Sequence, residues 1–185
     1  ELETPDVQFF FVHGSFASST DRKLDKEPGM TLAVYQCRPE SQGSIHIGGQ
    51  NPFDAPKIRP NFLADPLDQK TLIDGLHLCR SIGETRSMSQ YISHEMNPGV
   101  NVTTDDQMLQ FARDTGATTY HPMGTCKMGS DPLAVVDDRL KVHGIHGLRV
   151  VDASIMPTMP SGNINAPVIM IAEKAADMIK EDTIS

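Results

Sequence analysis

The sequence predicts an α+β fold, with strands in the first fifty residues and helices mainly in the remainder. Residues 7–13, 30–38 and 44–48 are short runs rich in β-branched, aromatic and aliphatic side chains, and turn-forming residues separate them. Farther along the chain, apolar side chains recur every three or four residues behind residues that favour helix starts. Together these patterns predict an antiparallel sheet backed by helices.

The first predicted strand, residues 7–13, includes three consecutive phenylalanines, and this run predicts burial on both faces of the sheet. Residues 15–29 are polar and are predicted to form a mobile loop. The strand at 44–48 is predicted from side chains that alternate with period two. Residues 51–56 and 59–61 are interrupted by prolines and are predicted to be extended loop.

Two helices have clear predicted starts. The first follows Asp65, which can cap the helix ahead of a proline at the first helical position, and Asp68 adds an acid to the first turn. Apolar residues at helical spacing then continue to about Gly83. The second helix is predicted behind Thr104, because Thr104 and Gln107 have the spacing of a capping box.

The C-terminal third is predicted to be a strand–helix segment. Residues 134–137 and 148–152 are predicted strands, the second of them buried, because each contains two consecutive valines. The last helix is predicted over residues 168–180, where apolar side chains fall on one face.

Composition excludes several classes of protein. The net charge is −8, the pI is about 5.2 and no basic cluster is present, which argues against nucleic-acid binding. The apolar runs are far shorter than the roughly 20 residues of a membrane-spanning helix. No signal peptide is recognised, but the chain lacks an initial methionine and enters a strand almost at once, so we interpret it as a fragment. Three cysteines form no disulfide framework and predict reduced thiols in a cytoplasmic protein.

Two segments have the composition of shaped loops. Residues 121–129 read His-Pro-Met-Gly-Thr-Cys-Lys-Met-Gly, in which proline removes a backbone donor while Gly124 and Gly129 allow unusual conformations. Residues 160–167 read Pro-Ser-Gly-Asn-Ile-Asn-Ala-Pro and lead into the last helix. Because shaped loops on rigid scaffolds often have functional roles, we expect these two segments to meet in space.

Several motifs in order resemble one protein family. Residues 121–129, Gly-Leu-Arg-Val-Val-Asp-Ala-Ser-Ile-Met-Pro at 147–157 and Ser-Gly-Asn-x-Asn-Ala-Pro at 161–167 resemble the C-terminal signature of the glucose–methanol–choline (GMC) flavoprotein oxidoreductases. Upstream, Arg-Pro-x-Ser-x-Gly-x-Ile at 38–45 and Pro-Asn-Phe-Leu at 60–63 also resemble this family. The resemblance therefore spans nearly the whole chain.

The resemblance implies a division of the chain. Residues 1–133 would form the substrate-binding domain, and residues 134–185 would return to the FAD-binding domain. The family's Gly-x-Gly-x-x-Gly turn, which lies near its N-terminus, is absent from this sequence. FAD would therefore be bound mostly outside this chain, and the fragment alone is expected to be inactive. Without the FAD domain, the C-terminal segment is expected to pack differently, dimerise or swap between chains.

The resemblance also implies two catalytic residues. His121 would be the base, because a histidine with a pKa near 6.5 can remove an alcohol proton while hydride passes to flavin N5. Asn163 stands where GMC proteins have a second histidine or an asparagine, and its amide can donate to the substrate oxygen. Each residue has a structural alternative: His121 could cap a loop, and Asn163 could serve turn geometry after Gly162.

Five further residues would approach the cofactor. By the resemblance, Asn165, Ala166 and Pro167 begin the helix that points at the pyrimidine end of the flavin, where a helix N-terminus favours negative charge. Asp152 and Ala153 would approach the ribityl or pyrophosphate part of FAD. The alternatives are a helix start capped only for stability and an aspartate that merely ends a strand.

The implied reaction is the oxidation of a primary alcohol, choline-like or other, with oxygen or a quinone as electron acceptor. Asn163 is typical of choline dehydrogenase-like proteins, whereas Asn-Ala-Pro at 165–167 departs from the Asn-Ala-Thr associated with them. One alternative is a catalytically silent ligand-binding module of the same fold, and another is a zinc hydrolase. No metal site is predicted, because the spacing of the candidate ligands matches no usual zinc pattern. These candidates are His121, Cys126, His143 and His146.

Overall fold

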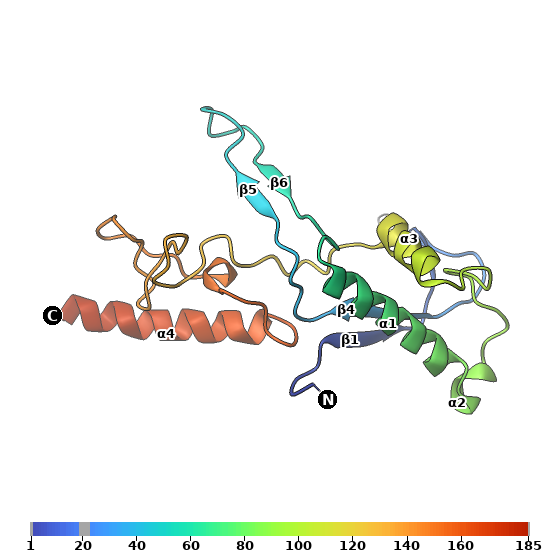
Figure 1. The fold of residues 1–185 in the computed structure, drawn as a ribbon. Helices are drawn as coiled ribbons and strands as arrows, with labels where there is room; N and C mark the ends of the chain where they lie inside the picture. The colour runs from blue at the N-terminus through green and yellow to red at the C-terminus, as the bar shows by residue number, and fades with distance from the viewer. Residues whose placement is uncertain (1, 19–22, 185) are drawn as a thin grey trace. The chain divides into compact units, whose positions relative to one another are not determined.

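The computed structural model describes residues 2–18 and 23–184, and it confirms a mixed α+β chain with small antiparallel sheets and helices (Figure 1). The chain divides into two units. Unit 1 comprises Glu1–Gln42 and Asn61–Thr119, and unit 2 comprises Gly43–Pro60 and Tyr120–Ser185. This structural division lies just before residues 121–129, called the His121 loop below. The functional division predicted between residues 133 and 134 stays a prediction.

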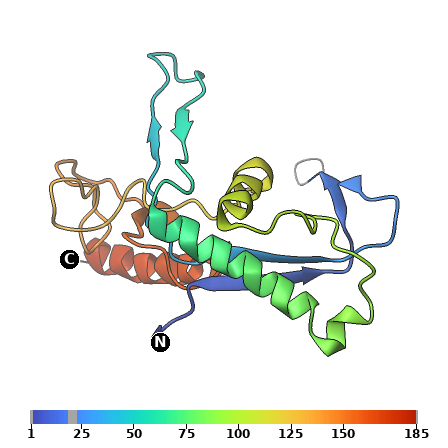
Figure 2. The same cartoon turned by 45° about the vertical axis from the view of Figure 1, so that its right-hand side comes forward.

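Unit 1 is built from a helix packed on a pair of strands (Figure 2). Strands β1 (Val7–Val12) and β4 (Thr31–Gln36) run antiparallel. Helix α1 (Pro66–Gly83) packs on β4 at Gly75, where an added Cβ would lie only 2.8 Å from Val34 Cγ2. The missing side chain therefore allows the close approach of helix and sheet.

Both predicted helix starts in unit 1 are confirmed. Asp65 Oδ1 accepts a hydrogen bond from Leu67 N at 2.8 Å. Helix α3 (Asp105–Thr115) begins with the expected capping box between Thr104 and Gln107. A short helix that was not predicted, α2 (Arg86–Ser89), lies between them in sequence.

Asp68 has a larger role than an acid in a first helical turn. Its side chain is 1% exposed, and its carboxylate accepts hydrogen bonds from Gln36 Nε2 (2.7 Å), Glu40 N (2.9 Å) and Ser41 N (2.8 Å). Asp68 therefore ties the start of α1 to the end of β4 and to the residues that follow it.

Two predictions for the N-terminal strands are wrong. Phe10 and Phe11 are 42% and 55% exposed rather than buried on both faces, because α1 is the helix that packs on β1 and β4 among the described residues. The predicted loop at residues 15–29 contains a second antiparallel pair, β2 (Phe16–Ser18) and β3 (Lys23–Leu24), while residues 19–22 lie outside the described ranges.

Unit 2 contains a hairpin and a mostly irregular C-terminal segment. The hairpin, residues 43–60, is called the arm below; its strands β5 (Ser44–His46) and β6 (Lys57–Arg59) pair antiparallel. The predicted strand at 44–48 thus forms a separate sheet, so the described strands make three two-stranded sheets rather than one. The rest of unit 2 includes the 3-10 turn η1 (Ala153–Ile155) and helix α4 (Asn165–Ile184), which begins three residues before its predicted start.

The strands predicted at 134–137 and 148–152 are wrong, since these residues form only isolated bridges. The cause is a sequence of turns between them. Asp137 Oδ1 accepts hydrogen bonds from Arg139 N (2.9 Å) and Lys141 N (2.8 Å), and Leu140 has a left-handed backbone with φ +64°. The chain therefore reverses before regular pairing can extend.

One apolar core holds unit 2 together. Helix α4 contributes Ile171 and Ala175, and the irregular segment contributes the remaining buried side chains. These are Val136, Leu140, Ile155, Met156 and Ile164.

Candidate functional site

The His121 loop lies along η1 and is hydrogen-bonded to it. Three alternate N–H groups of the loop donate to three successive carbonyl groups of η1. The pairs are Gly124 N to Ala153 O (3.3 Å), Cys126 N to Ser154 O (2.9 Å) and Met128 N to Ile155 O (2.8 Å). Two of the motifs found in the sequence therefore lie side by side. Cys126 takes part in this arrangement through its backbone N–H group.

The backbone turns sharply on both sides of His121. Tyr120 has φ +61° and a side chain that is 71% exposed, and Gly124 has φ +83°. A Cβ at Gly124 would also lie 3.3 Å from Met156 O, so glycine suits both the conformation and the space. The imidazole of His121 is half-buried between these two turns.

The segment with Asn163 is attached to the same core as the His121 loop. Ile164, next to Asn163, is 7% exposed and belongs to the core, and Met123, two residues after His121, packs against it. Gly162 N donates to Pro160 O at 2.8 Å, which makes a tight turn just before Asn163. The structure thus joins the two shaped segments through one core, and Asn163 itself is exposed.

The start of α4 exposes backbone donors. Val168 N donates to Ile164 O at 3.0 Å, so the N–H groups of Asn165 and Ala166 precede the first intrahelical bond. Both residues are exposed, and Pro167 has no N–H group. The first turn therefore has two N–H groups, at Asn165 and Ala166, that have no acceptor within the helix.

Asp152 and Ala153 lie at the junction of η1 with the His121 loop. Asp152 Oδ1 accepts from Ser154 N at 2.8 Å and so caps η1, a role that neither the cofactor prediction nor a strand-ending aspartate described. The Ala153 carbonyl is one of the three acceptors for the loop. Both residues therefore shape the backbone beside His121.

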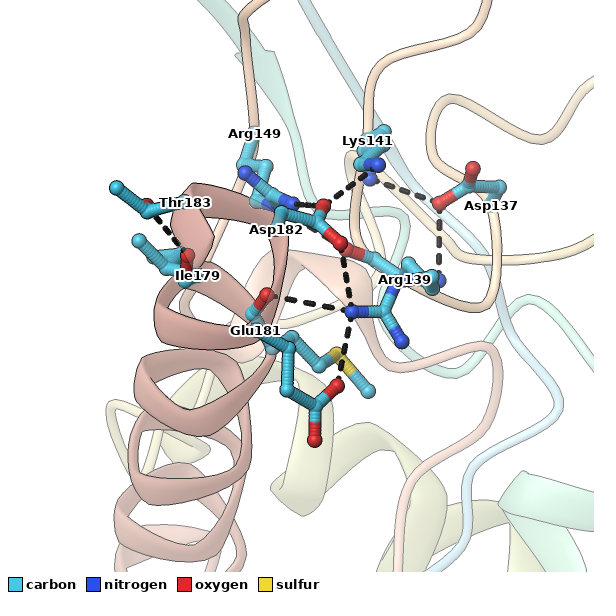
Figure 3. Close-up of polar contacts among 9 residues, drawn as sticks. Asp137, Arg139, Lys141, Arg149, Ile179, Glu181, Asp182 and Thr183 are labelled. Atoms are coloured by element: carbon cyan, nitrogen blue, oxygen red, sulfur yellow. Dashed lines mark hydrogen bonds and ion pairs between the residues drawn. The ribbon is translucent and has the colours of Figure 1, made fainter. Parts of the chain in front are cut away.

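A charged cluster that the sequence did not reveal fixes the far end of α4 (Figure 3). Asp182 forms ion pairs with Arg139 (2.9 Å), Lys141 (2.6 Å) and Arg149, and Arg139 also reaches Glu181 (3.1 Å). The hydrogen bond from Lys141, together with the charge of Arg139, lowers the pKa of the Asp182 carboxyl to about 2. Because its members are spread between residues 139 and 182, no local pattern could have indicated this cluster.

The histidines and cysteines do not gather into a metal site in the described ranges. Within residues 2–18 and 23–184, no group of three or more His, Cys, Asp or Glu side chains is arranged to hold a metal ion. His143 Nε2 instead lies 3.0 Å from Gly129 O. In that same part of the chain, no helix combines the length and the apolar character needed to cross a membrane.

Curated relatives share nearly the whole of this chain. Residues 39–172 match the family described as GMC oxidoreductase. An alcohol dehydrogenase (acceptor) of Pseudomonas putida is 45% identical over 179 residues, which are 97% of this chain and 32% of the relative. An oxygen-dependent choline dehydrogenase of Pseudomonas fluorescens is 41% identical over 180 residues, again 97% of this chain and 32% of the relative. The chain therefore spans about a third of the length of these relatives.

Solved structures show the same likeness. Pyridoxine 4-oxidase from Mesorbium loti has a TM-score of 0.88 and 31% identity, over 96% of this chain and 35% of that one. A formate oxidase of Aspergillus oryzae RIB40 has a TM-score of 0.86 and 30% identity, over 98% and 32%. An FAD-dependent oxidoreductase from Chaetomium thermophilum has a TM-score of 0.78 and 33% identity, over 83% and 27%. With a family match that includes the His121 loop, η1 and the first turns of α4, the chain belongs to the GMC oxidoreductase family.

Proposed function

We propose that this chain is the substrate-binding part of a longer FAD-dependent alcohol oxidoreductase, in which His121 removes the hydroxyl proton of a primary alcohol. One observation supports the proposal most strongly. In a chain of the GMC family, three backbone hydrogen bonds fix the His121 loop against η1, and the neighbouring Asn163 segment is attached to the same core. A base held in this way has the fixed position that proton transfer requires.

The residues present fit one part of FAD. The N–H groups of Asn165 and Ala166, which have no acceptor within the helix, suit the carbonyl edge of a flavin pyrimidine ring, at a helix end that favours negative charge. Asp152 and Ala153 lie beside the His121 loop, where the ribityl part of FAD is proposed to approach. The sequence has no Gly-x-Gly-x-x-Gly turn, so the dinucleotide phosphates would be bound by the remainder of the full-length protein. When bound, FAD supplies the acceptor for the hydride.

The side chains of this chain divide the remaining work. A ring nitrogen of His121, in the unprotonated form of the imidazole, accepts the proton of the substrate hydroxyl. The Asn163 amide donates a hydrogen bond to the same oxygen and stabilises the developing alkoxide by roughly 3 kcal/mol, the typical value for one such donor. Pro167, the third residue of α4, has no N–H group, so the N–H groups of the two residues before it are the donors of the first turn.

The substrate class is proposed from the relatives. These relatives are named for alcohol, choline, pyridoxine and formate, and we propose a primary alcohol, choline-like or other, as the substrate, with oxygen or a quinone as electron acceptor. Asn-Ala-Pro at 165–167 argues against a strict choline assignment. A cytoplasmic location is likewise proposed, from the reduced cysteines.

The test uses the full-length protein and a panel of alcohols, with a dye acceptor and with oxygen. We expect His121→Ala to lower kcat by about 10²-fold or more, the usual contribution of a general base, while flavin absorbance is retained. His94→Ala, at an exposed position in unit 1, is the control and should keep full activity. Full activity of His121→Ala, or a protein that contains no flavin, would contradict the proposal and favour a silent ligand-binding module.

A further inference from the structure

The arm has one apolar and one polar side. Ile45 and Ile58 are direct partners across the hairpin and therefore project from the same side of it. The flanking pairs project from the opposite side and are polar or basic. These pairs are Ser44 with Arg59 and His46 with Lys57.

The apolar side of the arm is open. Ile45 and Ile58 are 45% and 62% exposed, Ile47 is 85% exposed, and Phe53 at the turn is 93% exposed. Neighbouring exposed apolar side chains of this kind are typical of interaction surfaces. A hairpin of two strands is at most marginally stable in water by itself, so we expect the arm to have a partner.

The backbone of the arm is nevertheless well defined at both ends. At the base of the arm, a Cβ on Gly43 would collide with the Arg59 carbonyl oxygen, so only glycine lets the two segments of the hairpin approach this closely. At the turn, Asp54 N donates to Asn51 O at 3.0 Å, and Phe53 N donates to Asn51 Oδ1 at 3.1 Å. The arm therefore presents its apolar side chains from a fixed backbone.

We propose that the apolar side of the arm docks against the flavin-binding part of the full-length polypeptide, the part of its relatives that this chain does not span. The inference rests on the proposed function, because it takes the chain to belong to a longer flavoprotein. Relatives of which this chain covers only about a third have ample additional chain to cover the arm.

Two further observations favour this occupant over a second copy of the chain. The arm lies within residues 39–172, the region that matches the family, and it belongs to the same structural unit as the His121 loop and the start of α4. The flavin-binding part of the polypeptide would lie against the His121 loop and the start of α4. We therefore expect the same part to cover other open surfaces of unit 2, including the arm. The basic side, with Lys57 and Arg59, remains for solvent.

The first experiment is hydroxyl-radical footprinting of the wild-type full-length holoenzyme, which needs no variant. We expect Ile45, Ile58 and Phe53 to be modified several-fold more slowly than their intrinsic reactivity and exposure in this structure predict, at all protein concentrations. Full reactivity of the three side chains would overturn the proposal. Protection that disappears on dilution, together with a halved mass in sedimentation, would assign the surface to a second copy and also overturn it.

The second experiment compares matched variants of the two sides. The double variant Ile45→Ser/Ile58→Ser should release FAD at a lower temperature and retain several-fold less flavin after gel filtration, whereas His46→Ser/Lys57→Ser should behave as wild type. Equal flavin retention in both variants would contradict docking. If the apolar double variant fails to fold, Ile58→Ala replaces it with a smaller shift expected in the same direction. Neither readout depends on alcohol oxidation, so a protected arm in a protein without that activity would remove only the proposed function.

Discussion

The two units of this chain are held together in different ways. In unit 1 strands β1 and β4 and helix α1 form a regular frame, and side chains tie irregular segments to that frame. In unit 2 the backbone is mostly irregular, and its N–H groups are paired one by one, as in the hydrogen bonds from the His121 loop to η1. The candidate site lies in unit 2, where separate hydrogen bonds fix the backbone residue by residue. Such bonds let a loop take a specific shape.

Polar anchors in unit 1 show the contrast. Arg80 Nε binds both carboxylate oxygens of Glu95 at 3.1 Å, while its Nη1 and Nη2 donate to the carbonyls of Val102 (2.5 Å) and Gly99 (3.0 Å). One arginine of α1 thus organises a whole loop. The ionic cluster of unit 2 instead joins the last turns of α4 to nearby turns at the surface (Figure 3).

The largest expected effect is a charge in the core of unit 2. Val136 has no exposed surface, so Val136→Asp should destabilise unit 2 by about 4 kcal/mol or more, since the carboxylate would have no partner. Hydrogen exchange of the full-length protein should show lost protection in peptides of residues 120–184 and retained protection in 61–119. Exposed Asp138→Asn is the control, and an equal loss in both units would remove the contrast between them.

The next effect is expected in unit 1. Asp68→Ala leaves three donors without their acceptor and should cost about 3 kcal/mol, whereas Asp68→Asn keeps one acceptor oxygen and should cost less. Urea denaturation with exchange readout on residues 61–119 measures both. A loss confined to unit 2 would contradict this role.

Acid should act on the same carboxyl. Burial raises the pKa of the Asp68 carboxyl, but hydrogen bonds from Ser41, Glu40 and Gln36 together lower it by more. The pKa therefore lies below its ordinary value. Its stabilising contribution is therefore present above the pKa of the unfolded chain, near 3.9, and is lost as pH falls through the lower folded pKa. A titration of unit 1 stability from pH 5 downward should show this loss in the wild type and a flatter profile in Asp68→Asn.

A smaller effect is expected where α1 contacts β4. Gly75→Ala places a methyl group 2.8 Å from Val34 Cγ2, an overpacking that costs about 1–3 kcal/mol and is offset by up to about 1 kcal/mol of helix propensity. Gly83→Ala is the matched control, because its Cβ would meet Ile92 at an ordinary 3.5 Å. If Gly75→Ala is at least as stable as the wild type, the packing between α1 and β4 can relax. If the contact with Val34 is the cause of the loss, adding Val34→Ala to Gly75→Ala should recover the lost stability.

The smallest effect is expected at the ionic cluster, because exposed ion pairs contribute little. Asp182→Asn should speed exchange in the last turns of α4 only, and added salt should reduce its difference from wild type. The pKa of about 2 keeps these pairs formed above about pH 4 and breaks them as pH falls towards 2. Asp177→Asn, whose pair with Lys180 is 3.8 Å long, should change less; a loss as large as that of Val136→Asp would contradict the ranking.

Local chemistry decided how much of the fold could be predicted. Asp65 and Thr104 cap helices through bonds to residues two or three positions away, so sequence alone located both helix starts. The failed strand at 134–137 depended instead on the turn at Asp137 and on the left-handed Leu140, which the valine-rich pattern does not reveal. Burial of Asp68 could not be predicted either, because its donors come from another element.

The candidate site divides along the same line. The resemblance to the GMC family singled out His121 and Asn163, and their catalytic roles stay predictions. The hydrogen bonds that join residues 124–128 to 153–155 connect distant parts of the chain, so the sequence could suggest that the segments meet but not which atoms hold them.

The insertion of the arm within unit 1 has a consequence for synthesis of the chain. Because the arm precedes residues 61–119, it leaves the ribosome before unit 1 is complete and long before residues 120–185 of its own unit. During that interval its isoleucines are open to other nascent chains. Its two strands have only three residues each, and β6 includes Lys57 and Arg59; short length and positive charge are both features that disfavour pairing with another strand at such an edge.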